Sequence, residues 1–406
     1  MNPTWVTAVP TGNEKGDYLT IDLGGTNLRV FRVTLKGGGQ YEFTHTCSEI
    51  PEEAKKGTAE DLWLFVVDCF TKFQQTHSIS QPDLVRMPLA FTFSYPVSQN
   101  SIAHGVLQRW TKGFDIRGAE GEDVVAQMKR AFRRKRLMVK IVALVNDTTG
   151  TLMVSSYANP RTKIGSIFGT GCNAAYIDTC GNIPKLRQCG LPDQTPMAIN
   201  CEYGAFDNSH EVLPFTPNDL MIDRESPRPG QQCYEKMIAG HYLGEVFRQI
   251  LLDMHEKRDV IFRQQDVTSL RKQNIMGASD LILIEKDTSE DLHHTRVYLQ
   301  RRFNVVADAH EALFCRRVAH LIGQRAIRLY ACGIAAIILK RGYDSCDVAV
   351  DGSVFSKYPS FADQAMNALD EILQRPEGLR QRIRFTSTTD GSGVGAAVIA
   401  AMSQPK

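Results

Sequence analysis

One pattern occurs twice in the chain: a strand-like run, a turn that contains glycine, and a second strand-like run. In the first half, Tyr18–Leu23 and Leu28–Leu35 flank such a turn, and in the second half Ile164–Phe168 and Ala174–Ile177 do the same. Short runs of β-branched and apolar residues that stop at glycine are typical of paired strands. The 406 residues also exceed what one hydrophobic core usually supports, so we expect two domains with a cleft between them.

The remaining elements follow from hydrophobic periodicity. Helices are predicted at Ala59–Phe73, Glu120–Arg136, Gln231–His255 and Glu311–Lys340, with a last helix of small residues that runs to Met402. Further strands are predicted at Gln40–Thr46, Pro88–Phe93, Ile141–Val145, Val348–Val350 and Ile383–Phe385. We interpret Ile183–Pro229 and Val260–Phe303 as loop-rich stretches, because neither shows a clear period.

Composition excludes several classes of protein. The net charge of +2 gives no reason to expect nucleic-acid or membrane attraction. The basic run Lys129–Arg136 is interpreted as the solvated end of a helix. Ten cysteines without C-x-x-C spacing, and ten histidines without ligand spacing, argue against a zinc site or a disulfide framework. Met1–Val9 is too short for a signal peptide, and the apolar run Gly333–Leu339 is too short for a membrane span. We expect a cytoplasmic protein.

Four glycine-containing turns follow predicted strands: Gly24-Gly25, Gly169-Thr170-Gly171, Asp351-Gly352-Ser353 and Asp390-Gly391-Ser392-Gly393. Glycine lets backbone N–H groups approach an anion, and a threonine or serine hydroxyl adds a donor. Any one of them alone is interpreted as a tight turn, whereas four together favour a nucleotide-phosphate site. There is no P-loop motif. The run Gly391–Ala396 fits a dinucleotide fingerprint, but no strand and acidic residue follow it, which argues against an NAD-dependent oxidoreductase.

Polar residues gather in further segments. Phe91–Pro96 and Trp110–Phe114 place hydroxyl and amino groups beside aromatic rings. Asn146-Asp147 ends a buried strand, where Asp147 is either a general base or only a helix cap. Ala198–Gly204 and the stretch from Ser226 to Glu235 add amide and carboxylate groups. Converging donors and acceptors of this kind are what a polyhydroxylated ligand requires.

These segments closely resemble the motifs of the hexokinase family. The stretches IDLGGTNLRV, FTFSYPVSQNSIAHGVLQRWTKGF, VALVNDTTGTL, IFGTGCNAAY, MAINCEYGAFDN, SPRPGQQCYEKM, VDGSVFSKYP and DGSGVGAAVIAA occur in the family's order. The resemblance runs from about Trp5 to Met402 and is greatest to fungal hexokinases. It implies an α/β, two-domain actin-like/Hsp70-like ATPase fold with ribonuclease H-like mixed sheets, a hinge and an interdomain cleft. It also implies a small domain of residues 13–147 plus 391–406 and a large domain of residues 1–12 plus 148–390.

The resemblance implies ATP-dependent phosphorylation of a hexose at its 6-hydroxyl, the first step of glycolysis, on glucose and also fructose or mannose. The resemblance also implies that Asp147 is the general base that takes the proton of this hydroxyl. The residues that the resemblance assigns to the sugar are Ser94, Thr111, Lys112, Asn146, Asn173, Glu202 and Glu235. Those that it assigns to the nucleotide are Asp22, Gly24, Gly25, Thr26, Asn27, Thr170, Gly171, Gly352 and Ser353. Mg²⁺ is expected mainly through the nucleotide, with no metal ligand from the protein. Hexose and ATP are the expected partners of a monomer or homodimer that binds no nucleic acid and has no membrane span.

Two departures from the family pattern lie on the nucleotide side. Family members commonly carry a lysine just before the position of Pro51, where this chain has Thr46-Cys47-Ser48-Glu49. Gly277-Ala278 stands where relatives often have Asp-Thr. Each lost contact costs ~0.5–1.5 kcal/mol if it is an ordinary hydrogen bond. An alternative therefore stays open: a sugar-sensing regulatory homologue that binds hexose but has weak or no catalysis.

Overall fold

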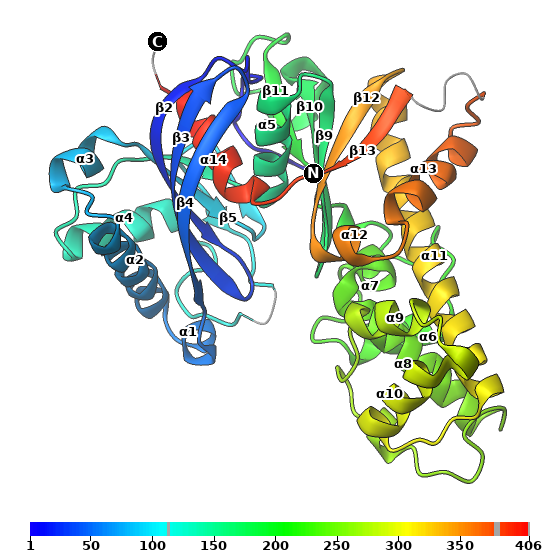
Figure 1. Cartoon of the computed structure of the whole chain (residues 1–406). Coiled ribbons are helices and arrows are strands. Elements are labelled where there is room, and N and C mark those ends of the chain that lie inside the picture. The colour runs from blue at the N-terminus through cyan, green and yellow to red at the C-terminus, as the bar shows by residue number, and fades with distance from the viewer. Residues whose placement is uncertain (112–113, 377–381, 405–406) are drawn as a thin grey trace.

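Two mixed β-sheets organise the computed structural model, which describes residues 1–111, 114–376 and 382–404 (Figure 1). The first sheet has the order β4-β3-β2-β5-β8. Its strands are β2 (Lys15–Leu23), β3 (Asn27–Gly37), β4 (Gln40–Glu49), β5 (Leu89–Phe93) and β8 (Ile141–Val145). The first three strands form an antiparallel meander, as predicted, whereas β5 and β8 continue the sheet in parallel. Both β5 and β8 are buried along their whole length, which explains their unbroken apolar sequences.

The second sheet has the order β1-β11-β10-β9-β12-β13. Its strands are β1 (Asn2–Pro3), β9 (Thr162–Phe168), β10 (Cys172–Thr179), β11 (Pro196–Asn200), β12 (Cys346–Asp351) and β13 (Ile383–Ser387). Here β9, β10 and β11 are antiparallel, and β12 and β13 join in parallel. The repeated strand–turn–strand pattern thus corresponds to one hairpin in each sheet. A small separate ribbon consists of β6 (Val97–Ser98) and β7 (Val106–Leu107).

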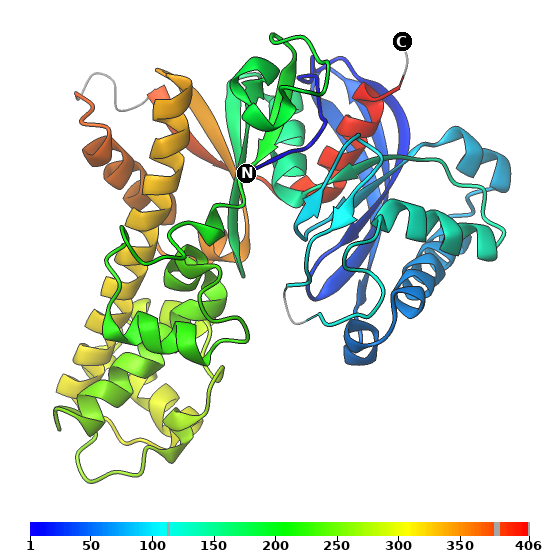
Figure 2. The ribbon, with the colours of Figure 1, turned by 180° about the vertical axis from the view of Figure 1, so that it is seen from behind.

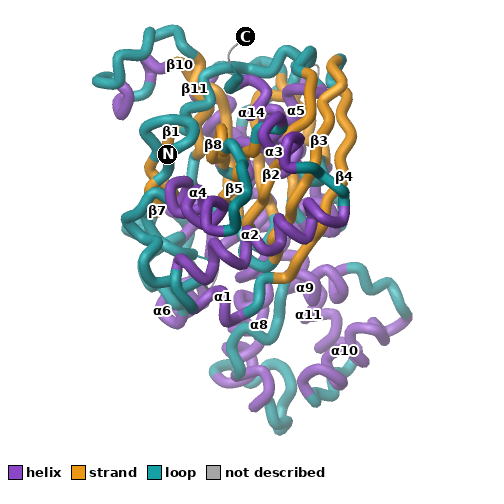
Figure 3. The backbone as a smooth tube through the Cα atoms, turned by 90° about the vertical axis from the view of Figure 1, so that its left-hand side faces the viewer, coloured by secondary structure: helices purple, strands orange, loops and turns teal. Residues whose placement is uncertain are grey.

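Helices cover both faces of the first sheet. On the outer face lie α1 (Glu52–Lys56), α2 (Ala59–Thr76), α3 (Gln81–Arg86) and α4 (Val124–Arg134) (Figure 3). On the inner face, α5 (Asp147–Ala158) and α14 (Gly391–Met402) lie between the two sheets (Figures 1 and 2). The last helix of the chain thus packs against α5, β2 and β5. The predicted domain boundaries at residues 13, 147 and 391 stay a prediction.

The contact between α5 and α14 is unusually close. A Cβ atom at Gly395 would overlap the backbone carbonyl of Gly150, and one at Gly150 would lie 3.0 Å from the carbonyl oxygen of Ser392. Glycine at both positions lets the two helix backbones touch. The glycines at the start of a helix suit either close packing or the approach of a phosphate, and the structure shows the close packing.

The second sheet carries a larger group of helices. They are α6 (Pro217–Glu225), α7 (Cys233–Ile238), α8 (Gly240–Glu256), α9 (Ala278–Glu285), α10 (His293–Phe303), α11 (Ala309–Arg341), α12 (Ser353–Lys357) and α13 (Phe361–Ile372). Short 3₁₀ turns are η1 (Cys180–Asn182), η2 (Pro184–Leu186), η3 (Tyr203–Ala205), η4 (Thr268–Arg271) and η5 (Glu290–Leu292). By length and composition α11 could cross a membrane, but 56% of its apolar window is buried inside the fold. It packs against α13, α9 and α8, so it is the central core helix of this part.

Two predictions about this part are wrong. The single helix predicted at Gln231–His255 is broken at Ala239, whose backbone is extended. There the N–H of Gly240 donates to the carbonyl of Gly169 over 2.8 Å, so a tertiary hydrogen bond replaces a helical one. The stretches predicted to be loops contain β11 and α6 in one case and α9 and α10 in the other. Helix α10 buries only Thr295, Leu299 and Phe303. So few buried positions make the hydrophobic periodicity of this segment weak, which explains why no helix was predicted there.

Candidate active site

Asp147 begins α5 directly after the buried strand β8. The preceding residue, Asn146, is the N-cap, and its side-chain oxygen accepts a hydrogen bond from the N–H of Thr148 over 2.9 Å. One carboxylate oxygen of Asp147 accepts from the same N–H over 2.8 Å. The capping position therefore belongs to Asn146, while Asp147 is held at the first helical position and is only partly buried. The carboxylate is oriented and remains accessible.

A network of amide and carboxylate side chains lies beside Asp147. The side-chain nitrogen of Asn173 on β10 donates to the hydroxyl of Thr148 over 2.8 Å, to Asn200 over 2.7 Å and to Glu202 over 3.3 Å. Asn200, at the end of β11, donates in turn to Glu202 over 2.9 Å. The structure thus brings together the predicted sugar residues Asn146, Asn173 and Glu202. Sequence reasoning missed Thr148 and Asn200 as site residues, although both stand inside the motifs that it quoted.

Glu202 has a left-handed backbone, with φ 50° and ψ 41°. This conformation is uncommon outside glycine and costs free energy. Hydrogen bonds at its backbone and its side chain hold it: the N–H of Glu202 donates to Asn173 over 2.9 Å, and its carboxylate accepts from Asn200 and Asn173. The strained residue keeps its carboxylate at the end of the second sheet.

Glu235 approaches the site from α7. Its carboxylate accepts a hydrogen bond from the N–H of Cys172 over 3.0 Å. A Cβ atom at Gly171 would lie 2.7 Å from the same carboxylate, and one at Gly204 would lie 3.1 Å from the Cβ of Glu235. Two glycines therefore make room for this side chain. Burial, together with the charges of Glu235 and Glu202, raises the pKa of the Cys172 thiol well above its usual value.

The two loops that carry Ser94 and Thr111 are joined through aromatic rings. Tyr95 packs edge-on against Trp110 with ring centroids 4.9 Å apart, and Trp110 stacks on Phe114 at 5.3 Å. The hydroxyl of Tyr95 donates to the carbonyl of Gly24 over 2.9 Å. Burial, and then the charges of Asp22 and Asp147, raise the pKa of Tyr95, which places this ring within electrostatic reach of both carboxylates. Lys112, the remaining predicted sugar residue, lies outside the described residues.

The predicted nucleotide residues lie in or beside three turns. Gly24, Gly25 and Thr26 join β2 to β3, with Asp22 near the end of β2 and Asn27 at the start of β3. Thr170 and Gly171 join β9 to β10, and Gly352 and Ser353 follow β12. The second and third turns touch, since a Cβ atom at Gly169 would lie 3.4 Å from the Cα of Gly352. Gly352 has φ 132°, a conformation that requires glycine. The first turn forms its hydrogen bonds with Tyr95 and Ile50, which belong to neither of the other two turns. That all three turns form a single nucleotide site therefore stays a prediction.

Arg29 connects the first turn to the start of α14. Its guanidinium donates to Asp22 over 2.7 Å and to Asp390 over 2.9 Å. The hydroxyl of Ser392 also donates to Asp22 over 2.7 Å. One carboxylate oxygen of Asp22 thus accepts two hydrogen bonds, from Arg29 and from Ser392. Sequence reasoning missed Arg29 and Asp390 because their contact joins residues 361 positions apart.

Asp351, at the end of β12, is a partly buried carboxyl near the same group. Burial raises its pKa to about 6, and the charges of Asp147 and Asp390 act in the same direction, while the charge of Arg29 opposes them. Because the pKa of Asp351 is higher in the folded protein than in the unfolded chain, the folded protein binds the carboxyl proton of Asp351 more tightly. The carboxyl therefore destabilises the fold increasingly as pH rises from about 4 through 6.

Asp351→Asn is expected to raise the stability at pH 7.5 by about 1–2 kcal/mol, because the amide is neutral at every pH. The gain should shrink towards zero near pH 4.5, where native Asp351 is protonated. Thermal unfolding of the ligand-free protein at both pH values measures this. Asp344→Asn, at an exposed carboxylate, is the matched control and should show no such pH dependence. An equal effect of Asp351→Asn at both pH values would contradict the assignment.

A group of possible metal ligands lies away from this site. Atoms of His210, Asp223 and Cys233 lie within 4.8 Å of one another. Asp223 is, however, already neutralised by Lys236 over 2.6 Å, and it accepts the N–H of Gly230 over 2.9 Å. Burial, and then the charge of Asp223, raise the pKa of the Cys233 thiol to about 11, which disfavours the thiolate that a metal needs. We interpret these contacts as structural hydrogen bonds.

Comparison with known proteins covers the whole chain. Two family profiles described as hexokinase match residues 1–157 and 163–402. A hexokinase of Emericella nidulans is 50% identical over 99% of this chain and 82% of its own length. Hexokinase-2 of Saccharomyces cerevisiae is 46% identical over 100% of this chain and 84% of its own. A hexokinase of Schistosoma mansoni, solved in complex with glucose, superposes with a TM-score of 0.90 at 34% identity, over 99% of this chain and 88% of its own.

Proposed function

Because the chain belongs to the hexokinase family and is a hexose kinase that uses ATP, we propose that it phosphorylates glucose, and also fructose or mannose, at the 6-hydroxyl with Asp147 as general base. One observation carries the proposal. Asp147 stands at the first position of α5, beside the hydrogen-bonded side chains of Asn146, Asn173 and Glu202. A proton acceptor thus lies next to groups that suit a polyhydroxylated ligand.

Phosphoryl transfer depends mainly on positioning and on charge stabilisation, with one group needed to orient and deprotonate the nucleophile. The N–H and hydroxyl of Thr148 both face one carboxylate oxygen of Asp147, at 2.8 and 3.3 Å. Among the described residues, the other oxygen has no hydrogen-bond partner. We propose that this oxygen takes the proton of the 6-hydroxyl as the new phosphate ester bond forms.

The sugar is proposed to bind Ser94, Thr111, Lys112, Asn146, Asn173, Glu202 and Glu235. ATP is proposed to bind the three glycine turns through Asp22, Gly24, Gly25, Thr26, Asn27, Thr170, Gly171, Gly352 and Ser353. Mg²⁺ would neutralise phosphate charge, and it would be held mainly by the nucleotide. One carboxylate oxygen of Asp22 accepts hydrogen bonds from both Arg29 and Ser392, so the protein already holds this side chain beside the first turn. Arg29 then sets the position of Asp22 and holds α14 near the turns.

A coupled assay of ADP production tests the function. Purified protein with Mg-ATP should release ADP in the presence of glucose and far less in its absence. The alternative is a sugar-sensing homologue, favoured by the missing lysine before Pro51 and by Gly277-Ala278. That alternative predicts glucose binding by calorimetry without glucose-dependent turnover. Strong turnover would exclude it.

Glu202→Ala is expected to weaken glucose binding by about tenfold or more, because an acceptor for sugar hydroxyls is lost and Asn173 and Asn200 lose a partner. The Michaelis constant for ATP should change little. Calorimetric titration with glucose measures the loss directly. Glu211→Ala, at an exposed carboxylate in the following loop, is the control. Unchanged glucose affinity in Glu202→Ala would remove Glu202 from the sugar site.

We also propose that the protein acts in the cytoplasm, where its substrates meet, as a monomer or homodimer. The charged residues are balanced, and Asp, Glu, Lys and Arg leave a net charge of +2. Cell fractionation and sedimentation of the purified chain test these two statements.

A further inference from the structure

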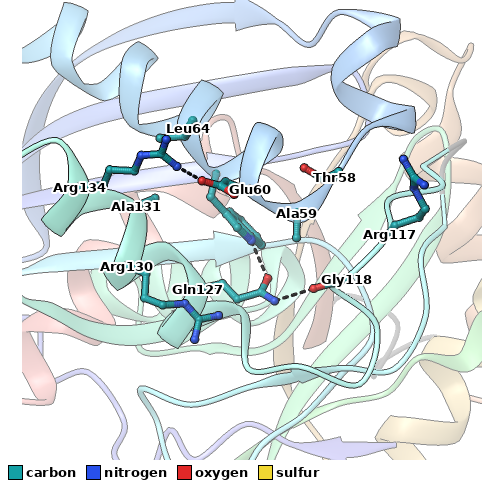
Figure 4. Close-up of a pocket in the computed structure, with 11 residues that line it drawn as sticks. Thr58, Ala59, Glu60, Leu64, Arg117, Gly118, Gln127, Arg130, Ala131 and Arg134 are labelled. Atoms are coloured by element: carbon teal, nitrogen blue, oxygen red, sulfur yellow. Dashed lines mark hydrogen bonds and ion pairs between the residues drawn. The ribbon is translucent and has the colours of Figure 1, made fainter.

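A cavity of about 510 Å³ opens beside α2 and α4, the helices on the outer face of the first sheet (Figure 4). Its walls are the first turns of α2, the middle of α4 and the segment Arg117-Gly118. Two hydrogen bonds of Gln127 fix its floor, of which the bond with Trp63 is buried. The indole N–H of Trp63 donates to Gln127 over 2.6 Å, and the amide of Gln127 donates to the carbonyl of Gly118 over 2.7 Å. The cavity is therefore built into the packing of α2 against α4.

The cavity is strongly basic. It is lined by Arg117, Arg130 and Arg134, and Glu60 is the one acidic residue among its described lining residues. Glu60 forms an ion pair with Arg134. The guanidinium groups of Arg117 and Arg130 form no hydrogen bond or ion pair with the described residues, and Figure 4 shows them on different walls. Both arginines are exposed, and neither guanidinium is paired within the described part of the chain, so both are open to an occupant.

This placement revises the interpretation of the basic run at Lys129–Arg136. The sequence favoured a solvated helix end, and the exposed Arg133 and the Lys135–Asp68 pair at 2.6 Å fit that reading. Arg130 and Arg134, however, lie one helical turn apart and line the same cavity. One face of the run is therefore part of a cavity wall.

We propose that this cavity binds a small phosphate ester with two anionic groups. A guanidinium presents two parallel N–H donors that match a phosphate, and unpaired arginines on separate walls match two such groups. The volume suits a small organic molecule, because ligand cavities usually measure about 300–1,000 Å³. The shared chemistry is a pair of phosphate groups, and its source is either an organic bisphosphate or inorganic pyrophosphate. The carbon skeleton would occupy the space over Trp63 and Gln127, which favours the organic ester.

The cavity is joined to the segment that carries Thr111. The N–H of Ala59 donates to the carbonyl of Arg117 over 2.9 Å, so α2 and the Arg117 segment move together. The indole N–H of Trp110 donates to Ile116 over 3.1 Å, which ties the start of the segment to its end. If Thr111 binds the sugar, as the proposed function states, an occupant that holds Arg117 also changes the affinity for glucose, and the coupling is reciprocal.

The test is calorimetric titration of the full chain with fructose 1,6-bisphosphate, in the presence of saturating glucose and a non-hydrolysable ATP analogue, which fill the active site without turnover. We expect binding that weakens about tenfold in Arg117→Gln and in Arg130→Gln, as each loses a charge-assisted hydrogen bond. Arg133→Gln, on the same helix but outside the cavity, is the matched control. Binding that is unchanged in the Arg117→Gln/Arg130→Gln double variant, or absent at millimolar ligand, would overturn the site.

Two further titrations test the kind of ligand and the coupling to glucose. Inorganic pyrophosphate should bind at least tenfold more weakly than the bisphosphate, and equal or tighter binding would overturn the assignment to an organic ester. Glucose titrations with and without the bisphosphate measure the coupling. Identical glucose affinities would overturn the coupling. A chain that does not bind glucose at all would contradict the proposed function, while the titrations with the bisphosphate would still test the cavity.

Discussion

Asp147→Ala is expected to lower kcat by about 10²–10⁴-fold, the range typical of losing a positioned general base. Glucose binding should stay within about twofold of the unmodified protein. The reason is geometric: the hydrogen bonds among Asn173, Asn200 and Glu202 do not pass through the carboxylate of Asp147. The measurements are the steady-state rate of ADP production and a glucose titration on the same preparation.

Asp147→Asn is the informative companion variant. Its side-chain oxygen can still accept the N–H of Thr148, as one oxygen of Asp147 does over 2.8 Å, but it cannot take a proton. We expect the same loss of kcat as in the alanine variant. Recovery of most of the activity in Asp147→Asn would mean that Asp147 positions the start of α5 rather than accepting the proton. Near-normal kcat in both variants would refute the base assignment.

Gly395→Ala is expected to destabilise the protein by about 3 kcal/mol, and thus to lower its unfolding midpoint by roughly 5 °C or more. The added methyl group would overlap the backbone carbonyl of Gly150, which no side-chain rotation can relieve. The helices α5 and α14 must then separate, and both of them pack in the core between the two sheets. Thermal unfolding followed by circular dichroism measures the shift.

Gly277→Ala is the matched control for this change. It adds the same methyl group where the nearest other atom, the hydroxyl of Ser279, lies 3.9 Å away, and its φ of −125° suits alanine. We expect a change in stability within about 0.5 kcal/mol. If Gly395→Ala is equally harmless, then the α5–α14 crossing adapts more easily than its geometry indicates.

The parts of the fold that could be predicted from sequence are those in which local pattern and tertiary environment agree. The meander of β2, β3 and β4 and the helix α2 are examples, since their apolar positions repeat with the period of the element. Ala239 shows the opposite case. Its neighbours favour helix, but the hydrogen bond of Gly240 to Gly169 fixes an extended residue. No local pattern contains that information.

The candidate site divides in the same way. Asn146, Asn173 and Glu202 were named from motifs, and the structure places them in one hydrogen-bonded network. Arg29 could not be named, because its partner Asp390 is distant in sequence and only the packing of α14 brings them together. Two arginines of the cavity, Arg130 and Arg134, stand in the basic run of the sequence, but that they line a cavity together with Arg117 depends on the packing of α4 against α2.

The position of α14 has a consequence for biosynthesis. This helix is made after every strand of the first sheet, yet it covers the inner face of that sheet. A nascent chain that has completed β8 still lacks this apolar cover for β2 and β5. Contacts between residues so distant in sequence form late, since their loop must close first. The first sheet therefore cannot fold completely until α14 has been synthesised, and until then it presents apolar surface to chaperones.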